Sequence, residues 1–222
     1  MCGVNVTPRI PNLIITMHKV KKIKLAVTGG IGSGKTAFCD FLKSEGIPVI
    51  NLDDISKELL EHDKDIIKKI TRIFGENSYL GGKPNKIFLA EKVFSNSENV
   101  LKINSILHPK VIKKVDILTG ELLKNNDIVV AEAALIYEAN MESRFDYIIL
   151  ITADKNLRMK RKIELENYSP EQFIKRNENQ IPEEEKTQYA DFVFGNNGNL
   201  DDLKNKAFLF SKIVKGLVNI ND

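Results

Sequence analysis

The chain of 222 residues has no tryptophan and only two cysteines, Cys2 and Cys39. The two thiols lie far apart and fit no metal-ligand or disulfide spacing, which favours a reducing compartment. No apolar run approaches the ~18 residues that a membrane-spanning helix needs. Internal repeats and low-complexity segments are also lacking. These absences exclude a disulfide framework, a cysteine metal site and a membrane-spanning protein.

The chain also lacks a large excess of charge of either sign. Its 33 lysines and arginines nearly balance 30 acidic residues and leave a formal net charge of +3. So small an excess says little about nucleic acid and would equally suit phosphorylated small molecules. A hydrophobic content of 42% and a charged content of 28% are ordinary for a soluble globular protein. We expect a cytoplasmic monomer or weak homo-oligomer that acts on a small molecule, with neither nucleic acid nor membrane as a partner.

The first residues lack the marks of a targeting signal. The stretch MCGVNVTPRIPNLIITM has no basic start followed by a long apolar core, so it makes a poor signal peptide. The first expected strand begins only at Ile23. We expect residues 1–22 to be an N-terminal extension, disordered and without a role in the fold, and either Met1 or Met17 to be the true start.

Short apolar runs recur along the rest of the chain and alternate with helical patterns. Each run is nearly continuous in apolar character, which is typical of strands buried on both faces of a parallel sheet. The five runs are Ile23–Thr28, Pro48–Asn51, Ile128–Ala131, Tyr147–Thr152 and Phe192–Phe194. A helical stretch, Lys35–Ser44, follows the first run and ends before Gly46 and Pro48. The alternation predicts an α/β fold with a doubly wound, five-stranded parallel sheet.

A long insertion separates the second and third runs. A crossover between parallel strands needs only a dozen residues or so, and this interval is far longer. Its helical patterns are Lys57–Phe74, Ile87–Phe94 and Asn99–Lys124. The surplus predicts an inserted helical subdomain at about residues 57–125.

A second insertion, at about residues 155–187, separates the last two runs and is dense in charge. Within it, the run Glu183-Glu184-Glu185 after Pro182 is expected to be a solvated helix start. We expect residues 23–222 to form a single domain that carries both insertions.

Residues Gly29-Gly30-Ile31-Gly32-Ser33-Gly34-Lys35-Thr36 match the pattern G-x-x-x-x-G-K-[ST] between an expected strand and an expected helix. The glycines let backbone N–H groups turn inward around an anion, and the helix that starts at Lys35 adds the positive end of its dipole. In such loops the lysine reaches the β- and γ-phosphates and the hydroxyl binds Mg²⁺. A glycine-rich turn without a ligand is the alternative. Because the flanking strand and helix are the context that a phosphate site requires, we predict that Gly29 to Ala37 bind the phosphates of ATP or GTP, with Thr36 on Mg²⁺.

The rest of the chain narrows the class of nucleotide-binding protein. It contains neither the Asp-x-x-Gly stretch nor the Asn/Thr-Lys-x-Asp guanine reader of a switch GTPase, and it is short for a motor or an AAA-type ATPase. A phosphate-loop protein with an inserted helical subdomain and a charged lid is typical of kinases of small acceptors. One insertion would bind the acceptor, and the other would close over ATP.

Several stretches, taken in order, resemble the pattern of the dephospho-coenzyme A kinase family. They are TGGIGSGKT, GIPVINLDDISKELL, FG, LAEKVF, ILHP, EAALIYE, RNENQ and ADFVFGNNG. Beyond the phosphate loop no single piece is specific, whereas the ordered set is. The resemblance covers the chain from Ile23 to its last helix and implies a P-loop kinase fold with a helical substrate subdomain and a helical lid. It also implies an activity, the ATP- and Mg²⁺-dependent phosphorylation of the ribose 3′-hydroxyl of dephospho-coenzyme A, the final step of coenzyme A biosynthesis.

An acidic residue follows the second expected strand. Ligands lie at the carboxyl ends of the strands in such sheets, and a carboxylate there can accept the proton of an acceptor hydroxyl. The resemblance matches Asp53 with the second acid of a family Asp-x-Asp pair, which implies a catalytic base that also contacts Mg²⁺. Asn51 replaces the first acid. A cap or an exposed acid is the alternative for Asp53, and Asp54 is expected to cap the following helix.

The second insertion carries a basic run, made up of Arg158, Lys160, Arg161 and Lys162. The resemblance implies that Arg161 contacts the transferring phosphoryl group, whereas Lys160 and Lys162 fit a solvated helix face. The family's second lid arginine is Leu165 here, and Arg158 is a candidate to replace it. Arg176 and Gln180 match the family's lid helix, where they would serve lid structure or contact phosphate.

The other binding residues are implied by the resemblance. The loop Asn196-Asn197-Gly198 after the last expected strand would contact adenine, or else serve only as a turn. The candidates for acceptor binding are Lys57, His108 and Glu138.

Several acceptor-side residues depart from the family pattern. Lys57 stands in place of an arginine and lacks its bidentate fork, and Glu132 and Ala134 replace an aspartate and a proline. His108, followed by Pro109, is expected to mark a helix boundary and could equally be structural.

Two other functions stay open. One is a nucleoside monophosphate-type small-molecule kinase, which only the acceptor would distinguish. The other is a nucleotide-binding module that has lost catalysis, and its support is the set of departures at Asn51, Lys57 and Leu165.

Overall fold

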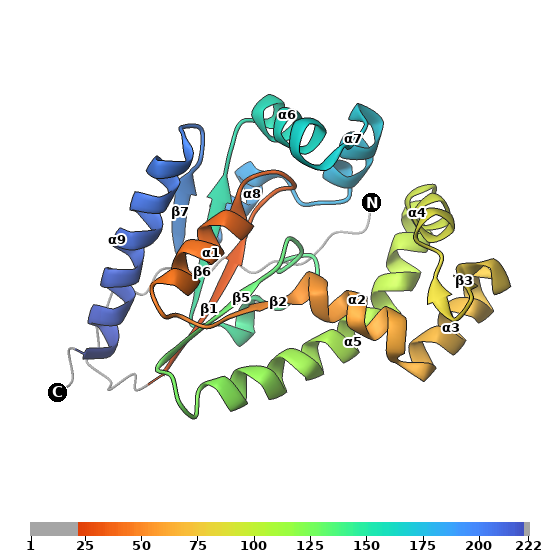
Figure 1. The fold of residues 1–222 in the computed structure, drawn as a ribbon, viewed down its shortest axis with the longest axis horizontal. Coiled ribbons are helices and arrows are strands. Elements are labelled where there is room, and N and C mark those ends of the chain that lie inside the picture. The colour runs from red at the N-terminus through yellow and green to blue at the C-terminus, as the bar shows by residue number, and fades with distance from the viewer. Residues whose placement is uncertain (1–21, 220–222) are drawn as a thin grey trace. The chain divides into compact units, whose positions relative to one another are not determined.

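Five parallel strands form the central sheet, in the order β2-β5-β1-β6-β7 (Figure 1). Their bounds are Ile23–Thr28 for β1, Val49–Asn51 for β2, Ile128–Glu132 for β5, Tyr147–Thr152 for β6 and Phe192–Gly195 for β7. This computed structural model describes residues 22–219, so the predictions about the N-terminal extension and its start lie outside the described residues. The sheet confirms the predicted α/β, doubly wound, five-stranded architecture.

The central strand β1 marks the place where the strand order changes direction. It pairs with β5 on one side, with Ile23 opposite Ile128, and with β6 on the other, with Leu25 opposite Tyr147. In open α/β sheets ligands bind at the carboxyl ends of the strands at such a switch point. The glycine-rich loop Gly29–Gly34 lies there, since it follows β1 directly.

One face of the sheet is covered by α1 (Lys35–Ser44) and α9 (Leu200–Asn219), which pack side by side (Figure 1). Alternate residues of the strands, such as Leu25 and Val27 of β1, belong to the same apolar core as Phe38 of α1 and Phe210 of α9. The Phe38 ring stacks on Phe194 of β7 with a centroid separation of 5.4 Å. This packing fixes α1, and therefore the glycine-rich loop that enters it.

The described residues divide into two compact units, one of them Asn51–Ile117 and the other residues 22–50 together with 118–219. The smaller unit holds helices, a short 3₁₀ turn and a two-stranded hairpin. Its elements are α2 (Leu52–His62), α3 (Lys64–Phe74), η1 (Glu76–Ser78), β3 (Tyr79–Leu80), β4 (Lys83–Pro84), α4 (Lys86–Phe94) and the start of α5 (Ser97–Leu122). Its apolar core is built from Ile66, Ile70, Leu89, Ile106 and Leu107.

Two details of the smaller unit differ from the sequence predictions. The single helix predicted at Lys57–Phe74 is divided at Asp63, whose side chain accepts the backbone N–H groups of Asp65 and Ile66 and caps α3. The helix boundary predicted at His108-Pro109 is wrong, because α5 continues through Pro109. An interior proline removes a helical hydrogen bond. Buried side chains before and after it, such as Leu107 and Val111, hold the helix in place by packing.

The larger unit contains three helices between β6 and β7. They are α6 (Lys155–Glu166), α7 (Pro170–Glu178) and α8 (Glu183–Thr187). Helices α6 and α7 lie beyond the carboxyl end of β6, on the same side as the glycine-rich loop (Figure 1). Ser169 and Gln172 form a capping box that starts α7. The lid function of this segment stays a prediction.

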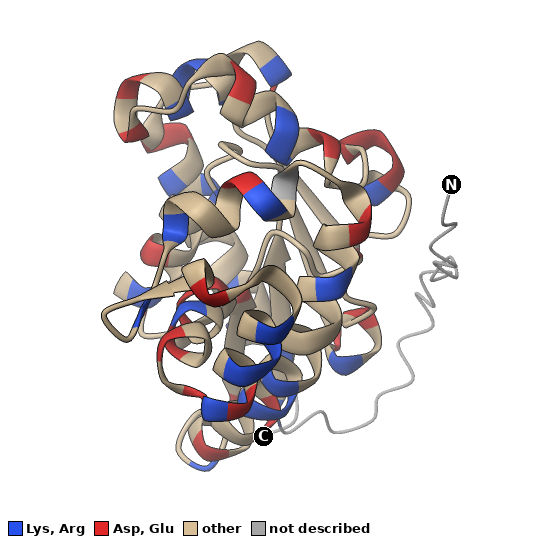
Figure 2. Cartoon of the chain, turned by 90° about the vertical axis from the view of Figure 1, so that its right-hand side faces the viewer, with Lys and Arg blue, Asp and Glu red and all other residues tan. Residues whose placement is uncertain are grey.

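Charged residues of both signs are interspersed along the helices, as Figure 2 shows, in keeping with the formal net charge of +3. Within residues 22–219, no helix is both long enough and apolar enough to cross a membrane.

Candidate functional site

The glycine-rich loop adopts a backbone that only glycine accepts readily at two positions. Gly32 has a φ of 79° and Gly34 a φ of 97°. A Cβ atom at Gly32 would lie 2.5 Å from the carbonyl oxygen of Arg158, and one at Gly34 would lie 2.2 Å from Nδ2 of Asn196. The loop therefore combines left-handed backbone with close approach of neighbouring groups, as an anion nest requires.

The loop leads directly into α1, which begins at Lys35 with no side-chain cap on Gly34. The first N–H groups of a helix have no intrahelical partner, so this end of α1 offers donors and a positive dipole to an anion. Ser33 is fully buried, and its hydroxyl has no hydrogen-bond partner among residues 22–219. Unused donors at this end of the helix fit a phosphate ligand, as the sequence predicts for Gly29 to Ala37.

The hydroxyl of Thr36 donates a hydrogen bond of 2.5 Å to Oε1 of Glu132. Glu132 is the last residue of β5, the strand beside β1, and only 2% of its surface is exposed. In phosphate-loop proteins Mg²⁺ is held by the loop hydroxyl and by an acid on a neighbouring strand. The sequence analysis identified Thr36 but missed Glu132 as its partner. An acidic residue that ends a wholly buried strand was the available signal.

The Thr36 hydroxyl and the Glu132 carboxylate are oxygen ligands of the kind that Mg²⁺ prefers. No group of three or more His, Cys, Asp or Glu side chains with metal-binding geometry occurs in the described part of the chain. Magnesium is typically bound by one or two protein oxygens together with substrate phosphates and water.

The nearby Cys39 is buried. This burial, and after it the charge of Glu132, raises the pKa of the Cys39 thiol. A neutral thiol there belongs to the core.

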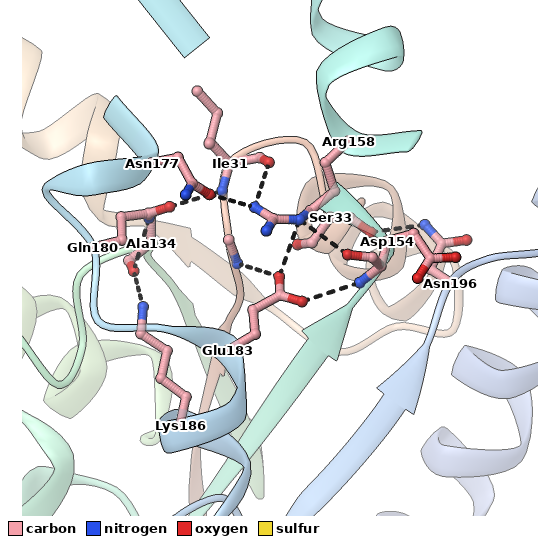
Figure 3. A network of polar contacts seen from close by, with 12 residues as sticks. Ile31, Ser33, Ala134, Asp154, Arg158, Asn177, Gln180, Glu183, Lys186 and Asn196 are labelled. Carbon is pink, nitrogen blue, oxygen red and sulfur yellow. Dashed lines mark hydrogen bonds and ion pairs between the residues drawn. The ribbon is translucent and has the colours of Figure 1, made fainter. Parts of the chain in front are cut away.

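The first half of the loop is bonded to the segment that follows α7. The N–H of Gly30 donates to Oε1 of Glu183 (3.2 Å) and that of Ile31 to Oε1 of Gln180 (2.9 Å), as Figure 3 shows. The prediction for Glu183 is half right: α8 does begin there after Pro182, but the residue is not solvated. Burial raises the pKa of its carboxyl, against the opposing effect of Arg158. Gln180 thus contacts the loop directly, and whether it also contacts phosphate stays a prediction.

Arg158 lies beneath the same half of the loop. Its Nε donates to the carbonyl oxygen of Ala153 (3.0 Å), and its Nη1 donates to the carbonyl oxygen of Ile31 (3.3 Å) and to Oδ1 of Asn177 (2.9 Å) (Figure 3). The side chain is buried, so its guanidinium is committed to the protein in this structure. Leu165, by contrast, is 78% exposed. Arg158 therefore supports the loop in this structure, and its replacement of an arginine at position 165 stays a prediction.

Arg161 of α6 is hydrogen-bonded to the loop at 196–198. Its Nη2 donates to the backbone carbonyl oxygen of Asn196 (2.9 Å), whereas its buried Nη1 has no partner within residues 22–219. Burial lowers the pKa of this guanidinium. A buried donor without a partner is unfavourable, so the geometry fits an anionic group that would complete the contacts of Arg161.

The loop Asn196-Asn197-Gly198 joins the glycine-rich loop to the base of α6. Nδ2 of Asn196 donates to the carbonyl oxygen of Ser33 (2.8 Å), and Oδ1 of Asn197 accepts the N–H of Asp154 (2.9 Å). These bonds give both side chains a structural task. The predicted adenine contact stays a prediction, and it would have to use the backbone of the loop or the remaining amide atoms.

Glu138 forms a buried ion pair with Lys186, a residue that the sequence analysis did not single out. Nζ of Lys186 lies 2.8 Å from Oε1 of Glu138, which also accepts the N–H of Ile181 (2.8 Å). Lys186 is fully buried and donates to the carbonyl oxygen of Ala134 as well (3.3 Å) (Figure 3). Oε2 of Glu138 has no hydrogen-bond partner among the described residues. Acceptor binding by Glu138 stays a prediction.

The other predicted catalytic and acceptor residues belong to the smaller unit. Asp53 is exposed in the first turn of α2, after Asn51, whose side chain accepts the N–H of Asp54 (3.1 Å). The cap predicted for Asp54 is therefore provided by Asn51, and Asp54 pairs with Lys57 (2.8 Å). His108 lies inside α5, where burial lowers the pKa of its imidazole. The roles of Asp53, Lys57 and His108 stay predictions.

A model of one protein family, dephospho-CoA kinase, matches residues 23–202. The chain belongs to the dephospho-CoA kinase family. A dephospho-CoA kinase of Bacteroides fragilis is 35% identical over 196 residues, which cover 86% of this chain and 95% of that protein. The predicted resemblance is thus confirmed over most of the sequence.

Solved structures agree with this membership in the dephospho-CoA kinase family. A crystal structure from Thermus thermophilus has a TM-score of 0.73 and 30% identity and covers 87% of this chain and 97% of its own. A dephospho-CoA kinase from Campylobacter jejuni has a TM-score of 0.66 and 28% identity, with coverages of 87% and 98%. A shikimate kinase from Acinetobacter baumannii, at 14% identity, 90% and 96% coverage and a TM-score of 0.51, shares the fold alone.

Proposed function

We propose that this chain transfers the γ-phosphoryl group of ATP to the ribose 3′-hydroxyl of dephospho-coenzyme A, giving coenzyme A and ADP. The family match over residues 23–202 carries the choice of acceptor. The chemistry of the donor side is supported by the glycine-rich loop, with its left-handed glycines and the start of α1 that no side chain caps. The same proposal has the chain act in the cytoplasm, as a monomer or weak homo-oligomer.

The glycine-rich loop would bind the triphosphate of ATP. Backbone N–H groups at the start of α1 would donate to phosphate oxygens, and Lys35 would reach the β- and γ-phosphates. Because these donors are already held in place by β1 and α1, they need little rearrangement as charge spreads over the transferred group.

Thr36 and Glu132 would hold Mg²⁺. When bound, the ion would supply neutralisation of the negative charge of the phosphates. The Thr36 hydroxyl and the Glu132 carboxylate already lie 2.5 Å apart, so both oxygens can address the same position at the carboxyl edge of the sheet. We include the predicted contact of Asp53 with the metal in this proposal.

Arg161 would contact the transferring phosphoryl group through the nitrogen that has no partner in the structure. An arginine in this role contributes about 10³- to 10⁵-fold in related phosphoryl transfers. Closure of the lid helices over ATP would exclude water and limit wasteful hydrolysis.

Asp53 would accept the proton of the 3′-hydroxyl. A positioned general base contributes about 10²- to 10⁴-fold. Its exposure in the first turn of α2 leaves the carboxylate accessible to a substrate. Lys57, His108 and Glu138 remain the proposed contacts of the acceptor, and the loop at 196–198 the proposed contact of adenine.

An end-point assay with Mg-ATP tests the function. Separate reactions would contain dephospho-coenzyme A, AMP, CMP, UMP, shikimate or no acceptor, and products would be identified by chromatography and mass. A gain of one phosphoryl group on dephospho-coenzyme A alone is expected. Transfer to a nucleoside monophosphate instead would show that the proposed acceptor is wrong and that the chain is a nucleoside monophosphate-type kinase. Binding of ATP without any transfer would favour a nucleotide-binding module that has lost catalysis.

A further inference from the structure

The outer limb of the glycine-rich loop, Gly30–Ile31, is bonded on both sides by side chains from the lid segment. Glu183 accepts the N–H of Gly30 at 3.2 Å, and Nη1 of Arg158 donates to the carbonyl oxygen of Ile31 at 3.3 Å. Oε2 of Glu183 also accepts the N–H of Ala153, just after β6, at 3.3 Å. Two side chains of opposite charge thus hold the two-residue segment Gly30–Ile31, one at the N–H of its first residue and one at the carbonyl oxygen of its second (Figure 3).

Arg158 and Glu183 also form a buried ion pair with each other. Nε of Arg158 lies 3.5 Å from Oε1 of Glu183, and the two side chains are only 7% and 13% exposed. A Cβ atom at Gly30 would lie 2.5 Å from Nη1 of Arg158 and 2.6 Å from Oε1 of Glu183, so the pair presses directly against the loop. Arg158 also contacts the ring of Phe173, whose centroid lies 5.9 Å from its guanidinium carbon.

The charge balance of this pair matters because of its place behind a phosphate-binding loop. Together the two groups carry no net charge, so their combined field at the loop is weaker than that of either charge alone. Glu183 alone would present a buried negative charge to the triphosphate, since removing one partner of a buried pair leaves an uncompensated charge. Arg158 alone would leave a positive charge there, which favours phosphate.

We propose that Arg158 and Glu183 are a positioning pair, which holds the outer limb Gly30–Ile31 in its phosphate-binding shape and cancels the charge of the Glu183 carboxylate behind it. The pair acts through the loop and touches no substrate. The inference rests on the proposed function only in requiring that the glycine-rich loop binds a nucleoside triphosphate.

A pair that merely stabilises the fold would behave differently. Its loss would lower the unfolding temperature without changing the affinity of the folded protein for nucleotide. A positioning pair predicts an ordered series of affinities. Arg158→Gln loses a loop contact and exposes the carboxylate charge. Glu183→Gln keeps only one of the two carboxylate oxygens that accept the N–H groups of Gly30 and Ala153. It also keeps the positive charge of Arg158, which favours phosphate.

The test measures the dissociation constant of Mg-ATP by calorimetry, without acceptor, on the full chain and three variants: Arg158→Gln, Glu183→Gln and the double variant. We expect Arg158→Gln to weaken binding roughly tenfold or more and Glu183→Gln by less. We expect the double variant to bind more tightly than Arg158→Gln, because removal of the carboxylate removes the repulsion. Single variants with the wild-type dissociation constant, or a double variant weaker than both, would overturn the proposal.

Two matched control variants each remove one positive or one negative charge from a neighbouring exposed residue. Lys160→Gln and Glu184→Gln alter exposed side chains of α6 and α8 and should keep the wild-type dissociation constant. If Arg158→Gln does not fold, Arg158→Lys keeps the charge but loses the planar fork. It should still weaken Mg-ATP binding, and an unchanged dissociation constant would count against the pair.

Failure of the proposed function would look different from failure of the pair. A wild-type chain that binds Mg-ATP but does not phosphorylate dephospho-coenzyme A would refute the acceptor and leave the affinity series valid. A wild-type chain that phosphorylates dephospho-coenzyme A, with variants of unchanged affinity, would refute the pair alone. A chain that binds no nucleotide would refute both.

Discussion

Thr36 and Glu132 lie 96 residues apart in sequence, yet the hydroxyl of the first donates to the carboxylate of the second over 2.5 Å. The contact exists because β5 pairs in parallel with β1, so that the end of β5 lies beside the start of α1. Parallel pairing therefore brings together the two oxygen donors to which we assign Mg²⁺.

We predict that Glu132→Gln weakens the binding of magnesium. The amide keeps an acceptor for Thr36 but loses the negative charge that attracts the ion. The magnesium concentration for half-maximal turnover should rise roughly tenfold or more. Titrating magnesium in the phosphorylation assay measures it. Glu121→Gln, an exposed change in α5, is the control, and an unchanged magnesium titration for Glu132→Gln would remove Glu132 from the metal site.

We predict that Asp53→Asn abolishes most turnover and leaves ATP affinity intact. The amide cannot accept the hydroxyl proton, and a general base contributes about 10²- to 10⁴-fold. Single-turnover rates and calorimetric affinities for ATP separate the two effects. Asp54→Asn is a closely matched control, because it is the neighbouring exposed acid and pairs with Lys57. Equal rates for Asp53→Asn and the wild type would assign the base elsewhere.

The parts of this fold that were predicted correctly are those determined by local sequence. The runs Ile23–Thr28 and Tyr147–Thr152 were located to the residue, because strands buried on both faces are continuously apolar. The division at Asp63 was missed, since the helical pattern continues on both sides of it. The course of α5 through Pro109 depends on packing that a proline signal does not reveal.

The candidate site divides in the same way. The glycine-rich loop was found because its residues are contiguous. Glu183 was taken for a solvated residue, because its partner Gly30 lies 153 residues away and only the folded chain brings them together. The pair of Lys186 with Glu138 was missed for the same reason, since an isolated lysine in a charged segment resembles a surface residue.

We predict that Arg161→Gln lowers kcat about 10³-fold or more while changing ATP affinity little, because the arginine acts mainly on charge in the transition state. Arg161→Lys should recover only part of the rate, since an ammonium cannot contact Asn196 and a phosphoryl oxygen with a planar fork. Steady-state kinetics with saturating ATP measure both variants. Lys160→Gln, on the same helix and exposed, should match the wild type. A large loss of affinity with unchanged kcat would make Arg161 a ground-state contact.

The ion pair of Asp63 with Lys110 predicts a pH-dependent contribution to stability in the smaller unit. Nζ of Lys110 lies 2.5 Å from Oδ1 of Asp63, and this hydrogen bond, followed by the cap on Ile66, lowers the pKa of the carboxyl. A lowered pKa in the folded state stabilises the fold above the unfolded pKa of about 3.9, and the contribution is lost as the pH falls through the folded pKa.

Asp63→Asn keeps a capping oxygen but loses the charge. Its urea midpoint should therefore lie below that of the wild type at pH 7, and the difference between the two midpoints should shrink below about pH 4. Asp63→Ala also loses the cap and should cost about 1 kcal/mol more. Asp65→Asn removes a 77% exposed carboxylate with a longer contact to Lys110 and should have a smaller effect at every pH. A gap between Asp63→Asn and the wild type that stays constant with pH would show that the charge of Asp63 does not contribute to stability.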